Sequence, residues 1–95
     1  MNLFMMIAVV PQGFSGKVTE AAARAGALHA LVIRARGASD LAKEGPFRFR
    51  IEPEEEIVLV KVTREIAETA SRMIHEEFDQ ASERGGSLYL IPLLS

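Results

Sequence analysis

The chain has 95 residues, 48% of them hydrophobic, with a formal net charge of −2 and no cysteine. The length predicts one domain spanning residues 1–95, and the lack of cysteine excludes disulfides and cysteine-ligated metal sites. The charge argues against general nucleic-acid binding, which needs a dominant basic face. A core this small leaves apolar surface uncovered, so we expect an oligomer. The lack of cysteine is compatible with a cytoplasmic protein, which is the location we expect.

The first predicted element is a strand from Leu3 to Val10. The run is apolar, contains β-branched side chains and ends at Pro11 and Gly13, which favours a strand over a helix. No basic residue precedes it, and it is too short to span a bilayer. We therefore expect neither a targeting signal nor membrane insertion.

A helix is predicted next, within the segment GFSGKVTEAAARAGA (residues 13–27). We expect the Ser15 side chain to accept hydrogen bonds from backbone N–H groups of the first turn, and Gly26 to follow the last turn. Small and apolar side chains recur at helical spacing, at Val18, Ala21, Ala22 and Ala25. They suggest a helix that lies close against a sheet.

Two further strands are predicted, one from Leu28 to Arg36 and one from Ile57 to Val62. In the first of them Leu31 and Ile33 share a face, and the other face becomes basic toward its end. A loop of about 15 residues, at about 37–52, separates the two strands, and loops of this length are often functional. The strand after the loop is apolar on both faces apart from Lys61, which again indicates a partner surface.

The second helix is the most regular pattern in the chain. Thr63 is expected to cap it, and Glu65 lies in its first turn, where the helix dipole favours a negative charge. Its apolar stripe is Ile66, Ala70, Met73, Ile74, Phe78 and Ala81. A break at residues 83–86 precedes the last strand, Leu88 to Leu94, in which Pro92 favours an edge position.

The order of elements is strand, helix, strand, strand, helix, strand. Two split βαβ units with right-handed crossovers form one four-stranded antiparallel sheet with both helices on one face. The sequence therefore predicts an α+β protein with the ferredoxin-like βαββαβ fold. The sheet face without helices is expected to form the core of an oligomer.

The long loop is strongly polarised. Residues 34–50 carry five cationic and two acidic side chains, and residues 52–56 carry four glutamates. Arginine and aromatic side chains are enriched in binding hot spots, so the loop is a candidate partner-docking surface, through Lys43, Phe47, Arg48, Phe49 and Arg50. We expect the tip of the loop to form a β-ribbon whose glutamates meet arginines of a neighbouring subunit. The alternative is a hairpin in which arginines pair locally with glutamates, and clustered glutamates before a strand are usually solvated.

Two segments are candidate anion sites. Arg36 and Gly37 place a guanidinium beside backbone N–H groups at the point where a strand opens into the loop. Arg84, Gly85 and Gly86 combine a bidentate donor with two glycines that let the backbone approach a phosphate. The alternative interpretations are a solvated strand end for the first segment and an ordinary helix-terminating turn for the second.

No catalytic constellation is present. The two histidines, His29 and His75, have no spacing typical of metal ligands, and His75 is expected on the flank of a helix. No nucleophile with an adjacent base and no phosphate-binding loop of the Walker type stands out. We therefore predict a protein that is not an enzyme and has no metal site.

The sequence resembles the PII-like (GlnB-like) signalling family, the relatives of the nitrogen regulatory protein PII. The resemblance covers nearly the whole chain and is carried by three segments: RARGAS (34–39), FRFRIEPEEEIVLVKVTRE (47–65) and FDQASERGGSLYLIPL (78–93). It implies a homotrimer with sheets facing inward and an adenine nucleotide (AMP, ADP or ATP) or similar anion between subunits. It also implies that the long loop, the family's T-loop, responds to the ligand and contacts a target protein.

The sequence departs from the family at two positions within these elements. Leu31 stands where the family commonly has a small polar residue near the adenine, and Ser87 stands where it has a lysine that binds phosphate. Two alternatives therefore remain open. One is a scaffolding trimer of the same fold that has lost its ligand, and the other is a metal-binding protein of the CutA type or an acylphosphatase-like enzyme.

Overall fold

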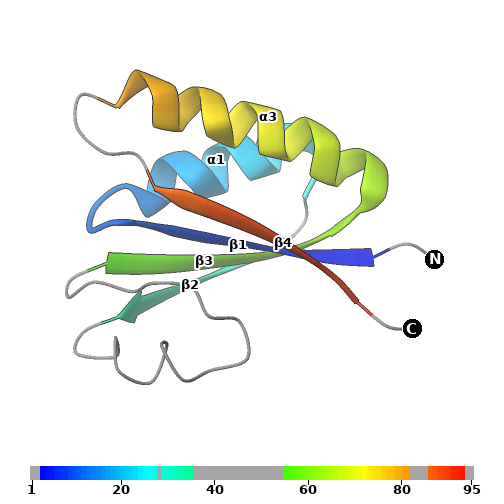
Figure 1. Ribbon diagram of the computed structural model, residues 1–95, viewed down its shortest axis with the longest axis horizontal. Helices are drawn as coiled ribbons and strands as arrows, with labels where there is room; N and C mark the ends of the chain where they lie inside the picture. The colour runs from blue at the N-terminus through cyan, green and yellow to red at the C-terminus, as the bar shows by residue number, and fades with distance from the viewer. Residues whose placement is uncertain (1–2, 28, 36–54, 82–85, 94–95) are drawn as a thin grey trace.

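The computed structural model describes residues 3–27, 29–35, 55–81 and 86–93. In chain order these residues form the elements labelled in Figure 1: β1 (Leu3–Pro11), α1 (Ser15–Ala25), β2 (Ala30–Ala35), β3 (Glu55–Thr63), α3 (Arg64–Gln80) and β4 (Ser87–Pro92).

The strands form one antiparallel sheet in the order β2-β3-β1-β4. The central strand β1 pairs with β3 along its whole length, from Leu3 opposite Thr63 to Pro11 opposite Glu55. Strands β2 and β4 are the two edges, which confirms the edge position expected from Pro92. This order, with a helix after β1 and another after β3, confirms the ferredoxin-like fold.

Both helices lie on one face of the sheet (Figure 1). They pack on the central strands β1 and β3 and against each other. The core between the layers is built from alternate residues of the strands and the small side chains of the helices: Met6, Ala8, Val10, Val58, Val60 and Val62 meet Val18, Ala21, Ala22, Ala67, Ala70 and Ile74. Small helical residues let the helices approach the sheet, as the sequence predicts.

The opposite face, here called the open face, is also apolar. Its apolar residues among those described are Met5, Ile7, Val9, Leu31, Ile33, Ile57, Leu59, Tyr89 and Ile91, and the charged residues Lys61 and Glu55 lie on the same face. Within it the edge strand β2 exposes Leu31 to 57% and Ile33 to 41%, and on the helix side of the same strand Val32 is 42% exposed. Strand β2 therefore exposes apolar side chains on both of its faces.

The predicted start of α1 needs a correction. Ser15 is the first helical residue, and Phe14 occupies the capping position without a side-chain hydrogen bond. The backbone N–H of Ser15 instead donates to a carboxylate oxygen of Glu56 on β3. The end of the helix is as predicted, because Gly26 adopts the left-handed conformation with φ of 112° and its N–H group bonds to the last carbonyls.

Helix α3 begins after Thr63, as predicted, but the Thr63 side chain makes no capping hydrogen bond. Glu65 lies in its first turn, and Ala70 and Ile74 of the predicted stripe are buried. Arg24 of α1 and Glu77 of α3 form an ion pair at 3.7 Å, which is partly exposed and contributes little. Neither helix of the described chain has the length and hydrophobicity needed to cross a membrane.

Candidate ligand-binding end of the sheet

Most of the predicted site residues lie outside the described residues. These are Arg36, Gly37, Arg84 and Gly85 of the two anion segments and Lys43, Phe47, Arg48, Phe49 and Arg50 of the partner loop. Of the predicted ligand-binding residues, Gly86 alone is described. The residues next to these segments, Ala35 and Ser87, are described and show where the two segments adjoin the sheet.

The described flanks of the two predicted anion segments lie at the same end of the sheet. Ala35, the last residue of β2, pairs with Glu55, which in turn pairs with Pro11. Ser87, the first residue of β4, pairs with Val9 of β1. Because β2 and β4 are opposite edges, three strand spacings of about 4.8 Å, about 14 Å in total, separate these flanks. A small anion cannot touch both flanks of one chain, whereas an elongated ligand or a second chain could complete the site.

Gly86 has a packing role that its sequence pattern did not reveal. A Cβ atom at this position would lie 2.7 Å from the carbonyl oxygen of Val9, 2.9 Å from Val10 Cγ1 and 3.3 Å from Phe78 Cζ. Any larger residue would push β4 away from β1. The structure therefore explains this glycine by close backbone approach, whether or not a ligand binds beside it.

A cluster of aromatic side chains at the same end of the sheet connects helix α1 to helix α3. The rings of Phe14 and Phe78 are 5.9 Å apart, and His75 lies 5.8 Å from Phe78. Lys17 places its ammonium 5.7 Å from the centre of the Phe14 ring. These contacts tie the start of α1 to the last turns of α3, directly beside Gly86.

Glu56 is the main polar residue at this end, and the sequence prediction for it was wrong. Glu55 and Glu56 were expected to be solvated, but they are only 6% and 5% exposed. One carboxylate oxygen of Glu56 accepts hydrogen bonds from the backbone N–H groups of Gly13 at 2.9 Å and Ser15 at 3.2 Å. The first turn of α1 contains no acidic residue of its own, so Glu56 supplies its negative charge from β3.

The environment of Glu56 favours its ionised form. Burial raises the pKa of the carboxyl, but hydrogen bonds from the Ser15 side chain and from the backbone N–H groups of Ser15 and Gly13, together with the charge of Arg34, outweigh it. The pKa is therefore lowered below 4.5. Glu56 is consequently a fixed anion at neutral pH and leaves the N-terminus of α1 unavailable to a free anion.

An ion pair between Arg34 and Glu56 connects strands β2 and β3, which flank residues 36–54. Arg34 Nε lies 3.8 Å from Glu56 Oε2, and the two residues are paired in register across β2 and β3. The Arg34 side chain is 78% exposed, so the contact is weak compared with the buried hydrogen bonds of the same carboxylate. This local pair matches the alternative interpretation of the loop, in which arginines meet glutamates within one chain.

The histidines show no metal-binding arrangement. His29 and His75 are both exposed, and His75 lies on the flank of α3, as predicted. Within residues 3–27, 29–35, 55–81 and 86–93, no group of three acidic, histidine or cysteine side chains is placed to hold a metal ion.

No protein-family model and no curated protein matches the sequence. Solved structures do match. A PII-like signalling protein from Thermus thermophilus has a TM-score of 0.70 at 19% identity, over 98% of this chain and 87% of that chain. The chain has the fold of PII-like signalling proteins.

Two other structures with the PII-like fold carry nucleotides. CPII from Thiomonas intermedia, bound to ADP, AMP and acetate, has a TM-score of 0.70 at 13% identity, over 97% of this chain and 86% of that chain. GlnK from B. subtilis, in complex with ATP, has a TM-score of 0.68 at 11% identity, over 97% and 82%. The match over nearly the whole chain confirms the fold expected from the resemblance, at sequence identities of 11% to 19%.

Proposed function

We propose that the protein is a divergent PII-like regulator that acts by binding and not by catalysis. It assembles as a homotrimer and binds a small anionic ligand, an adenine nucleotide or a similar anion, at subunit interfaces. Arg36, Gly37, Arg84, Gly85 and Gly86 contact the ligand. The ligand changes the conformation of the 37–52 loop, which engages or releases a target protein.

The observation that carries this proposal is the fold match over 98% of the chain to a PII-like signalling protein. Structures of the same fold hold ADP and AMP in CPII and ATP in GlnK. In this chain the flanks of both predicted anion segments lie at one end of the sheet, about 14 Å apart, which suits an elongated ligand such as a nucleotide.

Thermal melting with AMP, ADP, ATP and bicarbonate tests ligand binding. A ligand at a hundred times its dissociation constant stabilises the folded state by about 2.7 kcal/mol at one site. In a domain of this size the melting temperature rises by roughly 4–8 °C per kcal/mol, or less where unfolding is coupled to dissociation of an oligomer. We expect at least one adenine nucleotide to raise it. If no member of the panel does, the result contradicts nucleotide binding and favours the scaffolding alternative.

Variants locate the site in the same assay. Arg36→Ala and Arg84→Ala are each expected to reduce the nucleotide-induced rise, because each removes a charge-assisted hydrogen bond worth about 1.5–3 kcal/mol. Arg72→Ala, an exposed arginine on α3, is the matched control and should leave it unchanged. A rise that survives both site variants would place the ligand elsewhere.

The trimer is proposed to form through the open face and strand β2. Leu31, Val32 and Ile33 expose apolar side chains, which costs free energy in water, on a strand that is an edge of the sheet within the described part of the chain. Leu31→Lys is expected to convert the trimer to smaller species, measured by light scattering after size-exclusion chromatography. Ala23→Lys, on the exposed side of α1, is the control. A wild-type monomer, or a trimer that tolerates Leu31→Lys, contradicts this assembly.

The partner loop acts through Lys43, Phe47, Arg48, Phe49 and Arg50. A ligand shifts a loop between two states only by the difference in its affinity for them. The two ends of the loop are held by the sheet at Ala35 and Glu55, next to the predicted ligand residues Arg36 and Gly37. Ligand contacts at Arg36 and Gly37 are therefore well placed to favour one loop state.

A further inference from the structure

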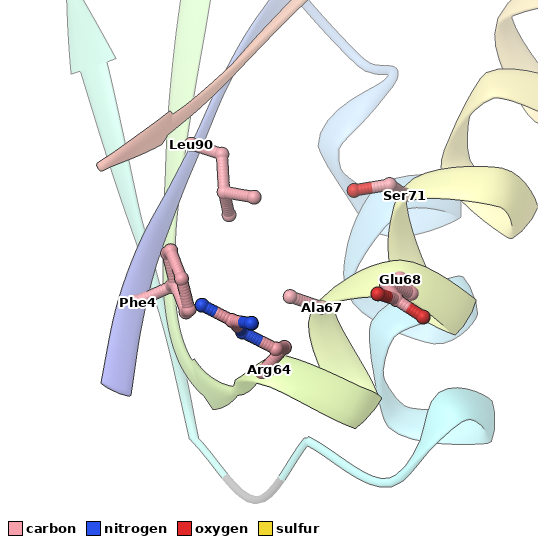
Figure 2. Close-up of a pocket in the computed structure, with 6 residues that line it drawn as sticks. All are labelled: Phe4, Arg64, Ala67, Glu68, Ser71 and Leu90. Carbon is pink, nitrogen blue, oxygen red and sulfur yellow. The ribbon is translucent and has the colours of Figure 1, made fainter. Parts of the chain in front are cut away.

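A pocket lies at the other end of the sheet from the candidate nucleotide site. It opens between the first turns of α3 and strands β1 and β4 and has a volume of about 390 Å³ (Figure 2). Phe4 and Leu90 line it from the strands, and Arg64, Ala67, Glu68 and Ser71 line it from the helix. Six residues of β1, about 20 Å, separate Phe4 from Val10 at the nucleotide end, so the two sites are distinct.

The pocket exists because the helical layer does not reach the β4 edge. Both helices pack mainly on the central strands β1 and β3. Leu90 points toward the helix side, where it is 44% exposed, and Phe4 beside it is half-buried. The strand side of the pocket is thus apolar, and Ala67 adds a further apolar contact from α3.

The helix side of the pocket carries two opposite charges that do not neutralise each other. Arg64 and Glu68 are one turn apart, a spacing at which an ion pair can form, yet within the described chain neither makes one. The Arg64 guanidinium instead lies 5.9 Å from the centre of the Phe4 ring (Figure 2). A guanidinium held over a ring in this way keeps N–H groups free to bind a carboxylate bidentately.

These features together fit a zwitterion with an apolar tail, and we propose that the pocket binds a free α-amino acid with an apolar side chain. Arg64 holds its carboxylate and Glu68 its ammonium group, because a turn of helix separates the two charges by a distance that one α-amino acid can bridge. The side chain covers Phe4, Ala67 and Leu90. The hydroxyl of Ser71, which points into the same space in Figure 2, accepts or donates the remaining hydrogen bond.

NMR titration of the ¹⁵N-labelled full chain with L-leucine tests the proposal. We expect saturable shifts of the backbone amide signals around Phe4, Ala67, Ser71 and Leu90. L-leucinamide lacks the carboxylate, N-acetyl-L-leucine lacks the ammonium group and glycine lacks the apolar side chain. Each of these three compounds should bind roughly tenfold more weakly or worse, because each loses one of the three contacts.

Matched variants separate specific binding from a general charge effect. Arg64→Gln and Glu68→Gln should each weaken leucine binding roughly tenfold or more. Arg72→Gln and Glu76→Gln change an arginine and a glutamate with the same spacing on the same helix, outside the pocket, and should leave binding unchanged. All four side chains are exposed, so the amide spectrum of each variant should remain that of a folded protein.

Three results would overturn the proposal: shifts that do not saturate, shifts that survive both pocket variants, or N-acetyl-L-leucine binding as tightly as leucine. The last result would instead indicate a site for a carboxylate or a chain terminus. The test is independent of nucleotide binding, because it reports on residues at the opposite end of the sheet.

Discussion

Replacing Glu56 with glutamine is expected to lower the free energy of unfolding by about 1.5–3 kcal/mol, the range for hydrogen bonds to a charged group. Glutamine has nearly the same size but no charge, so it cannot hold both N–H groups of Gly13 and Ser15 as strongly. It also removes the negative charge that the start of α1 otherwise lacks. The melting temperature should fall by roughly 4–8 °C per kcal/mol.

The pH dependence of stability tests whether the charge of the Glu56 carboxylate causes the loss of stability in Glu56→Gln. The pKa of Glu56 is lower in the folded protein than its ordinary value of 4.5. Its contribution is therefore fully present above the unfolded pKa, and is lost as the pH falls below 4.5 and through the lower folded-state pKa. Wild-type stability should decline over this window more steeply than that of Glu56→Gln, and the two curves should converge at the acid end.

The control for this experiment is Glu20→Gln, which changes an exposed glutamate on α1. Its stability is expected to remain within about 0.5 kcal/mol of the wild type, as for most surface substitutions. Equal pH profiles for the wild type and Glu56→Gln would show that the buried carboxylate does not stabilise the fold in the way described.

Replacing Gly86 with alanine is expected to destabilise the protein by about 1–3 kcal/mol, the usual cost of overpacking. The added methyl group would meet the Val9 carbonyl oxygen at 2.7 Å, and a backbone atom cannot rotate aside as a flexible side chain can. The steric clash can be removed only if β4 moves away from β1. Chemical denaturation monitored by circular dichroism measures the change, with the midpoint falling at an unchanged slope.

Gly16→Ala is the matched control for this substitution. Gly16 lies in α1, and a Cβ atom there would have nothing within 4 Å. Alanine is the better helix former, by about 0.5–1 kcal/mol in a helix interior, so this variant should be neutral or slightly more stable. If the two alanine variants had the same stability, the close approach of β4 to β1 at Gly86 would be refuted.

The elements of the fold could be predicted from the sequence because each has a strong local signal. Strand β1 is a short apolar run between turn residues, and α3 has an apolar stripe at helical spacing. The ferredoxin-like fold then followed from the order of strands and helices. The boundaries were less certain: β3 begins two residues before the predicted Ile57, so that Glu55 and Glu56 fall inside the sheet.

Glu56 was missed because clustered glutamates are usually solvated, and its partners lie about forty positions away in the sequence. A signal was nevertheless present. Every second residue of a strand lies on the same face, and Val58, Val60 and Val62 face the helices. Continuing this pattern back by two residues places Glu56 on the helix side as well. The absence of an acidic residue in the first turn of α1 indicates what that carboxylate would meet.

The pocket on α3 could not have been found from the sequence. Phe4, Arg64 and Leu90 belong to three different elements, and only the register of β4 on β1 brings them together. Arg64 and Glu68 look like an ordinary surface ion pair in the sequence. The predicted nucleotide and partner residues, other than Gly86, lie outside the described residues and stay predictions.

The pairing of Ala35 with Glu55 has a consequence for how this protein can evolve. Residues paired across antiparallel strands have Cα atoms only about 4.5–5.5 Å apart, so the sheet itself joins the two ends of the 36–54 segment. Doubling the length of such a segment then costs only about 0.6 kcal/mol in closure entropy. Insertions, deletions and new recognition sequences can therefore accumulate between these two residues with little effect on the stability of the sheet that carries them.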